Sequence, residues 1–305
     1  MLEGQRILVT GATGQVARCF AEQLARHNQV WAGARFRDAE ARKALEAQGI
    51  GIAPLTIGDE DLSSLPDVDY VFHCAANTSP TSPDVGMLHN AEGVGFLMQR
   101  YRDAKGFLHM SSSSVYRVQP GVSEPTREDA ELGGYSPYSP HYAASKLAGE
   151  AVARFQARAL GLPTTIARLD VAYGAHGHGG VPMILYDMMK GGATYTTSEA
   201  GPSYCSMIHE DDISEQLQNL ILAATVPATV VNLGGDEIVA VEEIIAWIEE
   251  LTGLRMKVET AAQASWGMKP LDNARRLELG GPCKVPWKEG VRRSLAARHP
   301  DAIRA

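Results

Sequence analysis

Short apolar runs alternate with amphipathic stretches along most of the chain. The run RILVT ends at Gly11, and QVWAGA, DYVFHCAA and GFLHM follow it as separate runs. Runs of this kind are typical of parallel strands that are buried on both faces. Between the first two runs the spacing is helical, because Val16, Phe20 and Leu24 recur at intervals of four residues. Strands that alternate with helices predict a parallel sheet covered on both faces.

The pattern continues with long helical stretches and two later strands. We expect helices at DAEARKALEAQG, GMLHNAEGVGFLMQRYRDA, HYAASKLAGEAVARFQARALG, HEDDISEQLQNLILAA and VEEIIAWIEELTG, and strands at PTTIARL and VVNLGG. The segment 172–205 interrupts the alternation, since it is rich in Gly, Tyr, Met and Pro. The predicted fold class is therefore α/β, a Rossmann-type doubly wound parallel sheet with a smaller C-terminal substrate lobe. Residues 1–171 and 206–236 would form the dinucleotide-binding domain, and 172–205 and 237–305 the lobe.

Composition and charge exclude several classes of protein. The chain has 305 residues, of which 45% are hydrophobic and 21% charged, with a net charge of −8. Since Lys and Arg do not cluster, no nucleic-acid partner is expected. No signal peptide is expected in MLEGQRILVTGATG, and no segment approaches the ~20 apolar residues of a membrane span. The four cysteines are scattered without a C-x-x-C pair, which favours reduced thiols and a cytoplasmic protein,. The expected partner is a small-molecule substrate.

A glycine-rich loop joins the first strand to the first helix. In VTGATGQVA, Gly11 permits a tight turn and Gly14 lets the backbone approach a ligand closely,. The N–H groups at the start of the helix then attract an anion. This position, after a strand and before a helix, predicts a dinucleotide phosphate site. The predicted contacts from this loop are Gly11, Thr13, Gly14, Gln15 and Val16.

The end of the second strand bears on the choice of dinucleotide. An acidic residue there would hold the ribose hydroxyls of NAD, but the chain reads GARFRD, with Arg35 at the strand end and Arg37 close by,. A guanidinium suits a 2′-phosphate, so NADP is favoured over NAD as the cofactor. Asp59, after the third strand, either accepts hydrogen bonds from the adenine amino group or is an ordinary helix cap.

Three tyrosine–lysine pairs share the spacing that places both side chains on one helix face. Tyr101/Lys105 ends a helix just before a strand, at the amino-end edge of the sheet, and Tyr186/Lys190 lies in the irregular segment. Tyr142/Lys146 opens the helix that follows the strand GFLHM and the serines of SSSSVY. Because a dinucleotide lies across the carboxyl ends of the strands, this third pair is the candidate for chemistry.

Taken together, TGATGQVA, HCAA, SSSSVY, YAASK and IHEDD resemble the short-chain dehydrogenase/reductase superfamily, in particular its extended branch, the NAD(P)-dependent epimerase/dehydratase family. The resemblance implies that Tyr142 is the general acid/base, that Lys146 is its partner and a ribose ligand, and that Ser112 polarises the substrate. It also implies a supporting role for Asn90 and a homodimer through the helices over 84–104 and 140–160. The remaining cofactor contacts that it implies are Cys74, Ala75, Ala76, Leu169 and Val171.

The acid–base chemistry of Tyr142 and Lys146 can also be considered without the family resemblance. A free tyrosine has a pKa near ~10. A unit charge ~4 Å away at an effective dielectric of ~20 is worth ~4 kcal/mol. Since one pKa unit is about 1.36 kcal/mol, Lys146 would lower the pKa of Tyr142 by at most about three, to near neutrality. Burial acts in the opposite direction.

Departures from the family pattern bear on the substrate. In RLDVAYG, Val171 stands where nucleotide-sugar enzymes of the family have asparagine, and Cys205 stands where they have an arginine. A cysteine cannot clamp a diphosphate as an arginine does. Ser113 and Ser114 replace the acidic residues of the family's dehydratases. We therefore expect an NAD(P)-dependent dehydrogenase/reductase for a small or apolar carbonyl or secondary alcohol. The alternatives are a nucleotide-sugar epimerase/dehydratase and a non-catalytic NAD(P)-binding sensor.

Several residues are candidates for the substrate pocket. Arg117 would either meet a substrate carboxylate or point into solvent. His176 and His178, in AHGHGG, would form either part of a metal site or a pocket loop. The loop is favoured and no metal is expected, because the sequence offers no evident third ligand. The predicted substrate contacts are Ser113, Ser114, Arg117, Tyr173 and Met183, with Ile184, Tyr186 and Met189 as further walls or as core of the lobe.

Overall fold

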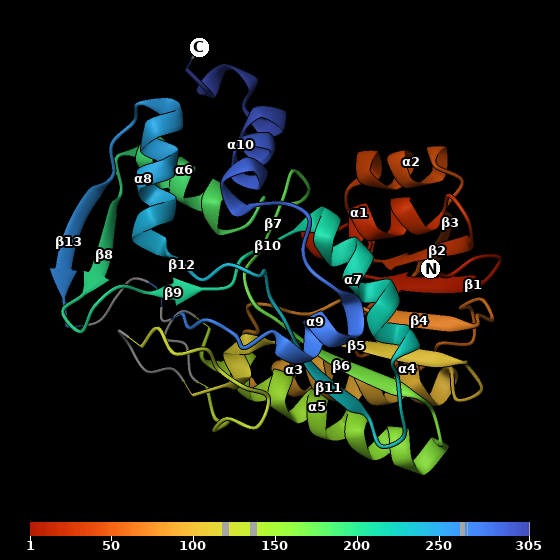
Figure 1. The fold of residues 1–305 in the computed structure, drawn as a ribbon. Helices are drawn as coiled ribbons and strands as arrows, with labels where there is room; N and C mark the ends of the chain where they lie inside the picture. Colours follow the sequence, from red (N-terminus) through yellow and green to blue (C-terminus); the bar gives the residue numbers. More distant parts are fainter. Residues whose placement is uncertain (118–121, 135–138, 263–265, 267, 305) are drawn as a thin grey trace.

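A seven-stranded parallel sheet forms the centre of the molecule in the computed structural model (Figure 1), which describes residues 1–117, 122–134, 139–262, 266 and 268–304. The strand order is β11-β6-β5-β4-β1-β2-β3, and every pairing is parallel. The predicted sheet is therefore confirmed. The strands are β1 Arg6–Thr10, β2 Gln29–Ala34, β3 Gly51–Pro54, β4 Tyr70–His73, β5 Gly106–Ser112, β6 Thr164–Leu169 and β11 Thr229–Leu233.

Helices cover both faces of this sheet, as the alternation of runs predicts. One face is covered by α1 (Gln15–Leu24) and α7 (Glu210–Leu222), and the other by α4 (Gly93–Arg100) and α5 (Pro140–Leu160). The remaining elements near the sheet are α2 Ala39–Ala47, α3 Pro83–Met87, a π-helical segment Leu88–Glu92, the 3₁₀ turn Ser113–Val115, and α9 Ala274–Gly280. No helix among the described residues has the length and apolar character needed to cross a membrane.

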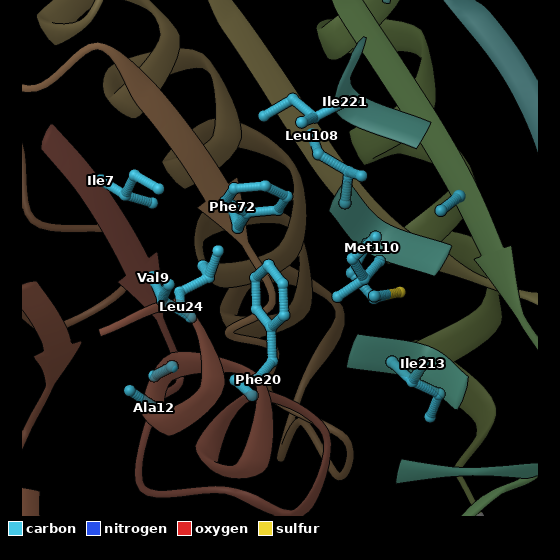
Figure 2. Close-up of a cluster of buried hydrophobic side chains, with 14 of the residues drawn as sticks. Ile7, Val9, Ala12, Phe20, Leu24, Phe72, Leu108, Met110, Ile213 and Ile221 are labelled. Carbon is cyan, nitrogen blue, oxygen red and sulfur yellow. The ribbon is translucent and has the colours of Figure 1, made fainter. Parts of the chain in front are cut away.

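Alternate residues of each strand face opposite layers of the core. Phe72 packs edge-on against Phe20 of α1, with ring centroids 4.6 Å apart, in the cluster drawn in Figure 2. Its strand neighbour Val71 belongs instead to the cluster on the α4–α5 side. Leu108 and Phe107 divide in the same way between the two clusters. A strand with both faces buried needs apolar residues at every position, which explains its continuous apolar run.

The order of the strands reverses at β1, which makes the sheet doubly wound. The chain moves from β1 outward to β2 and β3, and then returns to place β4 on the other side of β1. Open α/β sheets bind ligands in the crevice outside the carboxyl ends of the strands at such a switch point. The fold therefore places a binding crevice beyond Thr10 of β1 and His73 of β4.

A third hydrophobic cluster is built from elements of the second half of the chain. Most of these elements lie beside the sheet in Figure 1. The helices of this cluster are α6 (Val181–Gly191), α8 (Val241–Thr252) and α10 (Trp287–Arg298). The helix α10 was not expected from the sequence. The short paired strands are β7 Ala172–Tyr173 with β10 Ile208–His209, β9 Tyr204–Cys205 with β12 Val239–Ala240, and β8 Thr194–Ser198 with β13 Lys257–Ala261; a 3₁₀ turn, Pro300–Ala302, follows α10.

The helix α9 lies on the other side of the boundary that the sequence suggested. It falls in the range 237–305 that was assigned to the smaller lobe, but it packs against α7 and β11 of the sheet region. The division of the chain into two domains stays a prediction from the sequence.

A buried ion pair joins α5 to the sheet. Arg168 of β6 donates two hydrogen bonds to the carboxylate of Glu150 on α5, at 2.9 and 2.7 Å, and both side chains are almost fully buried. Ser111 of β5 donates to the same carboxylate at 2.6 Å. Arg168 also donates to the hydroxyl of Tyr116 and to the carbonyl of Glu128. The pair therefore holds β5, β6, α5 and the segment after β5 in one arrangement.

Replacing Arg168 with methionine should lower the free energy of unfolding by about 3–5 kcal/mol, because Glu150 would be left buried without its counter-charge. Urea denaturation measures this loss. The matched control is Arg42→Met, which removes the exposed Arg42–Glu46 pair on α2 and should cost less than about 1 kcal/mol,. Equal effects of the two substitutions would contradict the structural importance of the buried pair.

Candidate active site

A cavity of about 480 Å³ lies at the switch point, beyond the carboxyl ends of β1, β2, β3 and β4. Nine of the predicted cofactor contacts line it: Gly11, Thr13, Gly14, Gln15, Val16, Arg35, Cys74, Ala75 and Ala76. Its further walls come from Ala17, Gly33, Ala34, Leu55, Thr56, Ile57, Asn77, Thr78, His89 and His178. The predicted phosphate loop and the ends of three neighbouring strands therefore share one cavity.

The glycine loop has the geometry that close approach to a ligand requires. Gly11 has a φ of 75°, and a Cβ added there would lie 2.9 Å from the backbone of Ala75. Gly14 is the N-cap of α1 and makes no side-chain cap, so the first N–H groups of the helix face the cavity,. These features fit the diphosphate of a dinucleotide, which carries the charge that a helix N-terminus attracts.

The end of β2 presents an arginine to the same cavity. Arg35 is exposed and borders the cavity, while the next residue, Phe36, packs against the core with a φ of 49°. A left-handed conformation is costly for a bulky residue and is found where the surroundings impose it. In this turn Arg35 borders the cavity, while the side chain of Phe36 packs against the core. Asp59 is exposed and does not line the cavity, which Thr56 and Ile57 border instead.

The candidate catalytic hydroxyls lie together at the ends of β5 and α5. Ser112 is the last residue of β5, and Tyr142 lies in the first turn of α5. The Ser112 hydroxyl is close enough to the phenol of Tyr142 to lower its pKa. The Ser112 oxygen accepts a hydrogen bond from the backbone N–H of Ser114 at 3.2 Å. The structure therefore places the predicted serine and tyrosine near each other.

The pKa of Tyr142 differs from the expected direction. Burial raises the pKa of this phenol, and the nearby Ser112 hydroxyl lowers it by a smaller amount. The amine of Lys146 donates to the carbonyl of Met110 and does not lower the pKa of Tyr142. Burial, which disfavours the phenolate, therefore sets the direction of the shift.

Lys146 is buried one turn after Tyr142 and donates a hydrogen bond to the carbonyl of Met110 at 2.6 Å. Burial lowers the pKa of this amine to about 8, while the nearby carboxylate of Glu150 acts to raise it. At neutral pH the amine is largely protonated. The lysine therefore places a positive charge beneath the site, held against β5.

Asn90 lies in the π-helical segment before α4. Its side chain accepts from the backbone N–H of Asn77 and donates to the carbonyl of Asn77 and to the hydroxyl of Ser145. Since Asn77 lines the cavity and Ser145 precedes Lys146, Asn90 connects the cavity wall to the catalytic helix. This arrangement suits the supporting role that the family resemblance implies.

Two buried histidines under the site were not foreseen from the sequence. His73 of β4 and His109 of β5 stack with ring centroids 5.6 Å apart. Burial, followed by the charge of Lys146, lowers the pKa of both, that of His73 to about 3. Thr10 shares a hydrogen bond of 2.8 Å with His73. Both rings are therefore neutral beside the lysine.

Asp170 was also missed, although it follows β6 directly. One carboxylate oxygen accepts from the hydroxyl of Ser113 at 2.8 Å, and the other accepts from the backbone N–H of Ser206 at 2.7 Å. Burial raises the pKa of Asp170 to about 7 despite these hydrogen bonds. The carboxyl group thus engages Ser113, a predicted substrate contact, while the hydroxyl of Ser114 is buried without a partner among the described residues.

Leu169 and Val171 flank this carboxyl group. Leu169 pairs with Ser112 across β5 and β6 and is buried, while Val171 packs partly against the lobe cluster. Neither lines the cavity.

Two predicted substrate residues lie inside the protein. Tyr173 and Met183 are 1% and 0% exposed and belong to the core of the lobe, as do Tyr186 and Met189. They pack against other apolar side chains, so their assignment as pocket walls is corrected. Arg117 forms an exposed ion pair of 2.8 Å with Glu131, which occupies its guanidinium.

The two histidines of the glycine-rich segment after β7 have different surroundings. His176 shares a hydrogen bond of 2.9 Å with Glu210, and His178 borders the cavity. The structure does not group the two histidines as ligands of one site: His176 lies instead with Cys19 and Glu210, and these three residues bring one possible ligand atom each to within 4.8 Å of one another. Glu210 also accepts from the backbone N–H groups of Ala175 and His176, so its oxygens are already engaged.

A glycine loop at the switch point of a doubly wound sheet defines a dinucleotide-binding protein of the Rossmann type. The chain belongs to the family described as the NAD dependent epimerase/dehydratase family, which matches residues 7–234. This confirms the resemblance identified from the sequence motifs. No curated protein matches the chain in sequence.

Solved structures with the same fold include several epimerases. UDP-glucuronic acid 4-epimerase from Bacillus cereus, in complex with NAD, is 21% identical, with a TM-score of 0.80 over 95% of this chain and 96% of that one. UDP-glucose 4-epimerase from Thermotoga maritima, with UDP-glucose, is 24% identical, with a TM-score of 0.79 over 96% and 98%. UDP-N-acetylglucosamine 4-epimerase from Methanobrevibacter ruminantium is 19% identical, with a TM-score of 0.82 over 97% and 98%. At these identities the likeness establishes the fold.

Asp170 should make the stability of the protein fall as the pH rises. Its native pKa of about 7 lies above the ordinary value of 3.8. Between these values the native state binds more protons than the unfolded state, so the free energy of unfolding decreases with rising pH. The Asp170→Asn variant lacks this titration. Relative to wild type it should therefore gain roughly 2–4 kcal/mol between pH ~4 and ~7.5.

Urea denaturation at a series of pH values measures this difference. Asparagine offers one acceptor fewer to Ser206, but that loss is independent of pH and leaves the slope informative. The control is Asp187→Asn at an exposed position of α6, which should follow the wild-type curve. Parallel curves for Asp170→Asn and wild type would contradict the raised pKa.

Proposed function

We propose that this chain is a nicotinamide-dependent enzyme that oxidises a secondary alcohol or reduces the corresponding carbonyl at the site of Ser112 and Tyr142. The observation that carries the proposal is the placement of Ser112 at the end of β5 and Tyr142 in the first turn of α5, with the buried Lys146 one turn further on, near a cavity that fits a dinucleotide. Ser112, Tyr142 and Lys146 are proposed as catalytic residues, with Asn90 in support.

The residues have separate roles in this proposal. The bound nicotinamide supplies the hydride acceptor or donor. Tyr142 removes the hydroxyl proton of the substrate during oxidation and returns it during reduction. Ser112 donates a hydrogen bond to the same oxygen, where negative charge develops. Lys146 supplies a positive charge that favours the deprotonated phenol once the amine turns from the Met110 carbonyl towards the site,.

Of the candidate functions, nucleotide-sugar epimerisation is the one that the family match and the similar structures support best. The family description and the UDP-sugar 4-epimerases of the same fold favour it over the dehydrogenase/reductase expected from the sequence. In such a reaction the hydride is removed from a carbinol carbon and returned to its opposite face. The same serine, tyrosine and lysine serve both half-reactions.

Net oxidation or reduction of a smaller substrate is the second candidate. One observation favours it: Cys205, at the position where the family's nucleotide-sugar enzymes have an arginine, is fully buried and directs its thiol to the carbonyl of Val239. A buried thiol offers a diphosphate no charge-assisted hydrogen bond.

NADP is proposed as the preferred cofactor because Arg35 borders the cavity, although the Bacillus cereus epimerase structure named above contains NAD. A homodimer through α4 and α5 is supported by an apolar groove between these helices, where Phe155 is 68% exposed. A cytoplasmic location stays a prediction from the sequence.

Tyr142→Phe should lower turnover by at least about 100-fold, since general acid–base catalysis typically contributes ~10²–10⁴-fold. Binding of the dinucleotide should change little. The matched control is Tyr186→Phe, which removes a hydroxyl from the tyrosine–lysine pair of the lobe and should retain activity. Wild-type rates in Tyr142→Phe would refute the assignment.

The assay for these variants also separates the two candidate functions. UDP-sugars are incubated with enzyme and NAD or NADP, and the product is resolved by chromatography while nicotinamide absorbance is followed. Epimerisation converts the sugar without a net absorbance change. Steady oxidation of NADPH or NADH by a panel of carbonyl compounds, with no UDP-sugar converted, would instead support the second candidate.

Arg35→Ser should weaken NADPH binding by about 10- to 100-fold, the value of a hydrogen bond to a charged group. NADH binding should change by less than about 2-fold, because NADH lacks the 2′-phosphate that the guanidinium would contact. Fluorescence titration of both reduced cofactors measures the two constants. Arg37→Ser is the control at an exposed neighbouring position; equal loss of NADPH and NADH binding in Arg35→Ser would argue against a role in 2′-phosphate recognition.

A further inference from the structure

We propose that His178 is a cofactor-binding residue whose Nε2–H donates a hydrogen bond to the diphosphate of the bound dinucleotide. It does so from a glycine-rich segment, residues 174–180, which we call the clasp loop. This inference rests on the dinucleotide binding of the proposed function and adds a residue from outside the phosphate loop.

The clasp loop lies directly against the start of α1. Gly177 has a φ of 56°, and a Cβ added there would lie 2.8 Å from the Gln15 backbone nitrogen. From the other direction, the Gln15 side chain donates to the carbonyl of Ala172 at 2.7 Å, just before the clasp loop. His178 is exposed and borders the cavity together with Gly14 and Gln15. The histidine therefore adjoins the helix N-terminus that would receive the diphosphate.

The hydrogen bonds of the imidazole fix which nitrogen carries the proton. The backbone N–H of Gly180 donates to Nδ1 of His178 at 3.2 Å, so Nδ1 is an acceptor. Partial burial and the charge of Arg298 lower the pKa of His178, which keeps the ring neutral at neutral pH. A neutral ring with Nδ1 as acceptor carries its hydrogen on Nε2. Within the described part of the chain, Nε2 has no hydrogen-bond partner, and phosphate oxygens are strong acceptors for such a donor.

The clasp loop is held in place by two distant helices. Glu210 of α7 accepts from the backbone N–H groups of Ala175 and His176. Arg298, at the end of α10, donates to the carbonyls of Ala175 and Gly177 at 2.7 and 2.8 Å. These contacts position the clasp loop through hydrogen bonds from the protein itself. A donor positioned in this way contributes to binding without a large loss of conformational entropy.

The test compares ligands with and without a diphosphate. His178→Ala should weaken ADP-ribose binding by about 5- to 20-fold in isothermal titration, the effect of losing one hydrogen bond to an anion at a partly exposed site. Binding of adenosine, followed by ligand-observed NMR, should stay within about 2-fold. His178→Gln, whose amide can both accept and donate, should recover most of the affinity. His27→Ala, at an exposed position away from the cavity, is the control.

Unchanged ADP-ribose binding in His178→Ala would overturn the inference, and so would an equal loss of ADP-ribose and adenosine binding. Melting temperatures of all variants establish that the fold is retained. If the wild-type protein binds neither ADP-ribose nor NAD(P)H, the proposed function itself fails. If wild type binds ADP-ribose and His178→Ala binds it equally well, only the role of His178 is removed.

Discussion

The geometry of the candidate site depends on the ion pair between Arg168 and Glu150, which is closed off from solvent. Glu150 lies on the same helix as Tyr142 and Lys146, and it also accepts the hydroxyl of Ser111, the residue before Ser112. One carboxylate thus fixes α5, which carries Tyr142 and Lys146, against the strand that carries Ser112. A buried pair of charges is a costly way to join two elements, and apolar residues would often stabilise the protein as well. A bidentate contact between a guanidinium and a carboxylate has a defined geometry. The pair therefore fixes the orientation of α5 relative to β6.

The same carboxylate affects the chemistry of the site. Glu150 follows Lys146 by one helical turn and acts to raise the pKa of the buried amine, which desolvation has lowered to about 8. Without that negative charge the amine would be harder to protonate in its apolar surroundings. The interaction that positions the helix therefore also helps Lys146 to keep its charge at neutral pH. Glu150 therefore affects both the packing of α5 and the charge state of Lys146.

Local patterns in the sequence were sufficient for much of this description. The continuous apolar runs predicted the parallel strands, and a glycine turn between a strand and a helix predicted the cavity that Gly11 and Gly14 now line. Chain order also placed Tyr142 at the start of the helix that follows β5, where the structure has it; its role as the acid/base stays a prediction. These inferences succeed where a property is set by residues close in sequence.

Inference failed where a property is set by contacts that are distant in sequence. Asp170 has its unusual environment only because Ser113 and Ser206 converge on it from two other segments. Tyr173 and Met183 were assigned to a pocket wall, yet the same apolar character fits the core of the lobe, and only packing distinguishes the two. The helices α9 and α10 were missed within a basic stretch whose apolar spacing is weak, and Arg298 of α10 is the residue that reaches back to the clasp loop.

The electrostatics of the candidate site indicate the protonation states of its residues. Burial raises the pKa of Tyr142 and lowers those of His73 and His109, so the phenol and both imidazoles are uncharged. Lys146 carries the positive charge and rests on the carbonyl of Met110. A phenol in its acid form is ready to give a proton to a carbonyl oxygen, whereas taking a proton from an alcohol requires the lysine charge to approach it first. In the proposed reaction, the distance between the Lys146 amine and the phenol would therefore influence which direction of proton transfer is favoured.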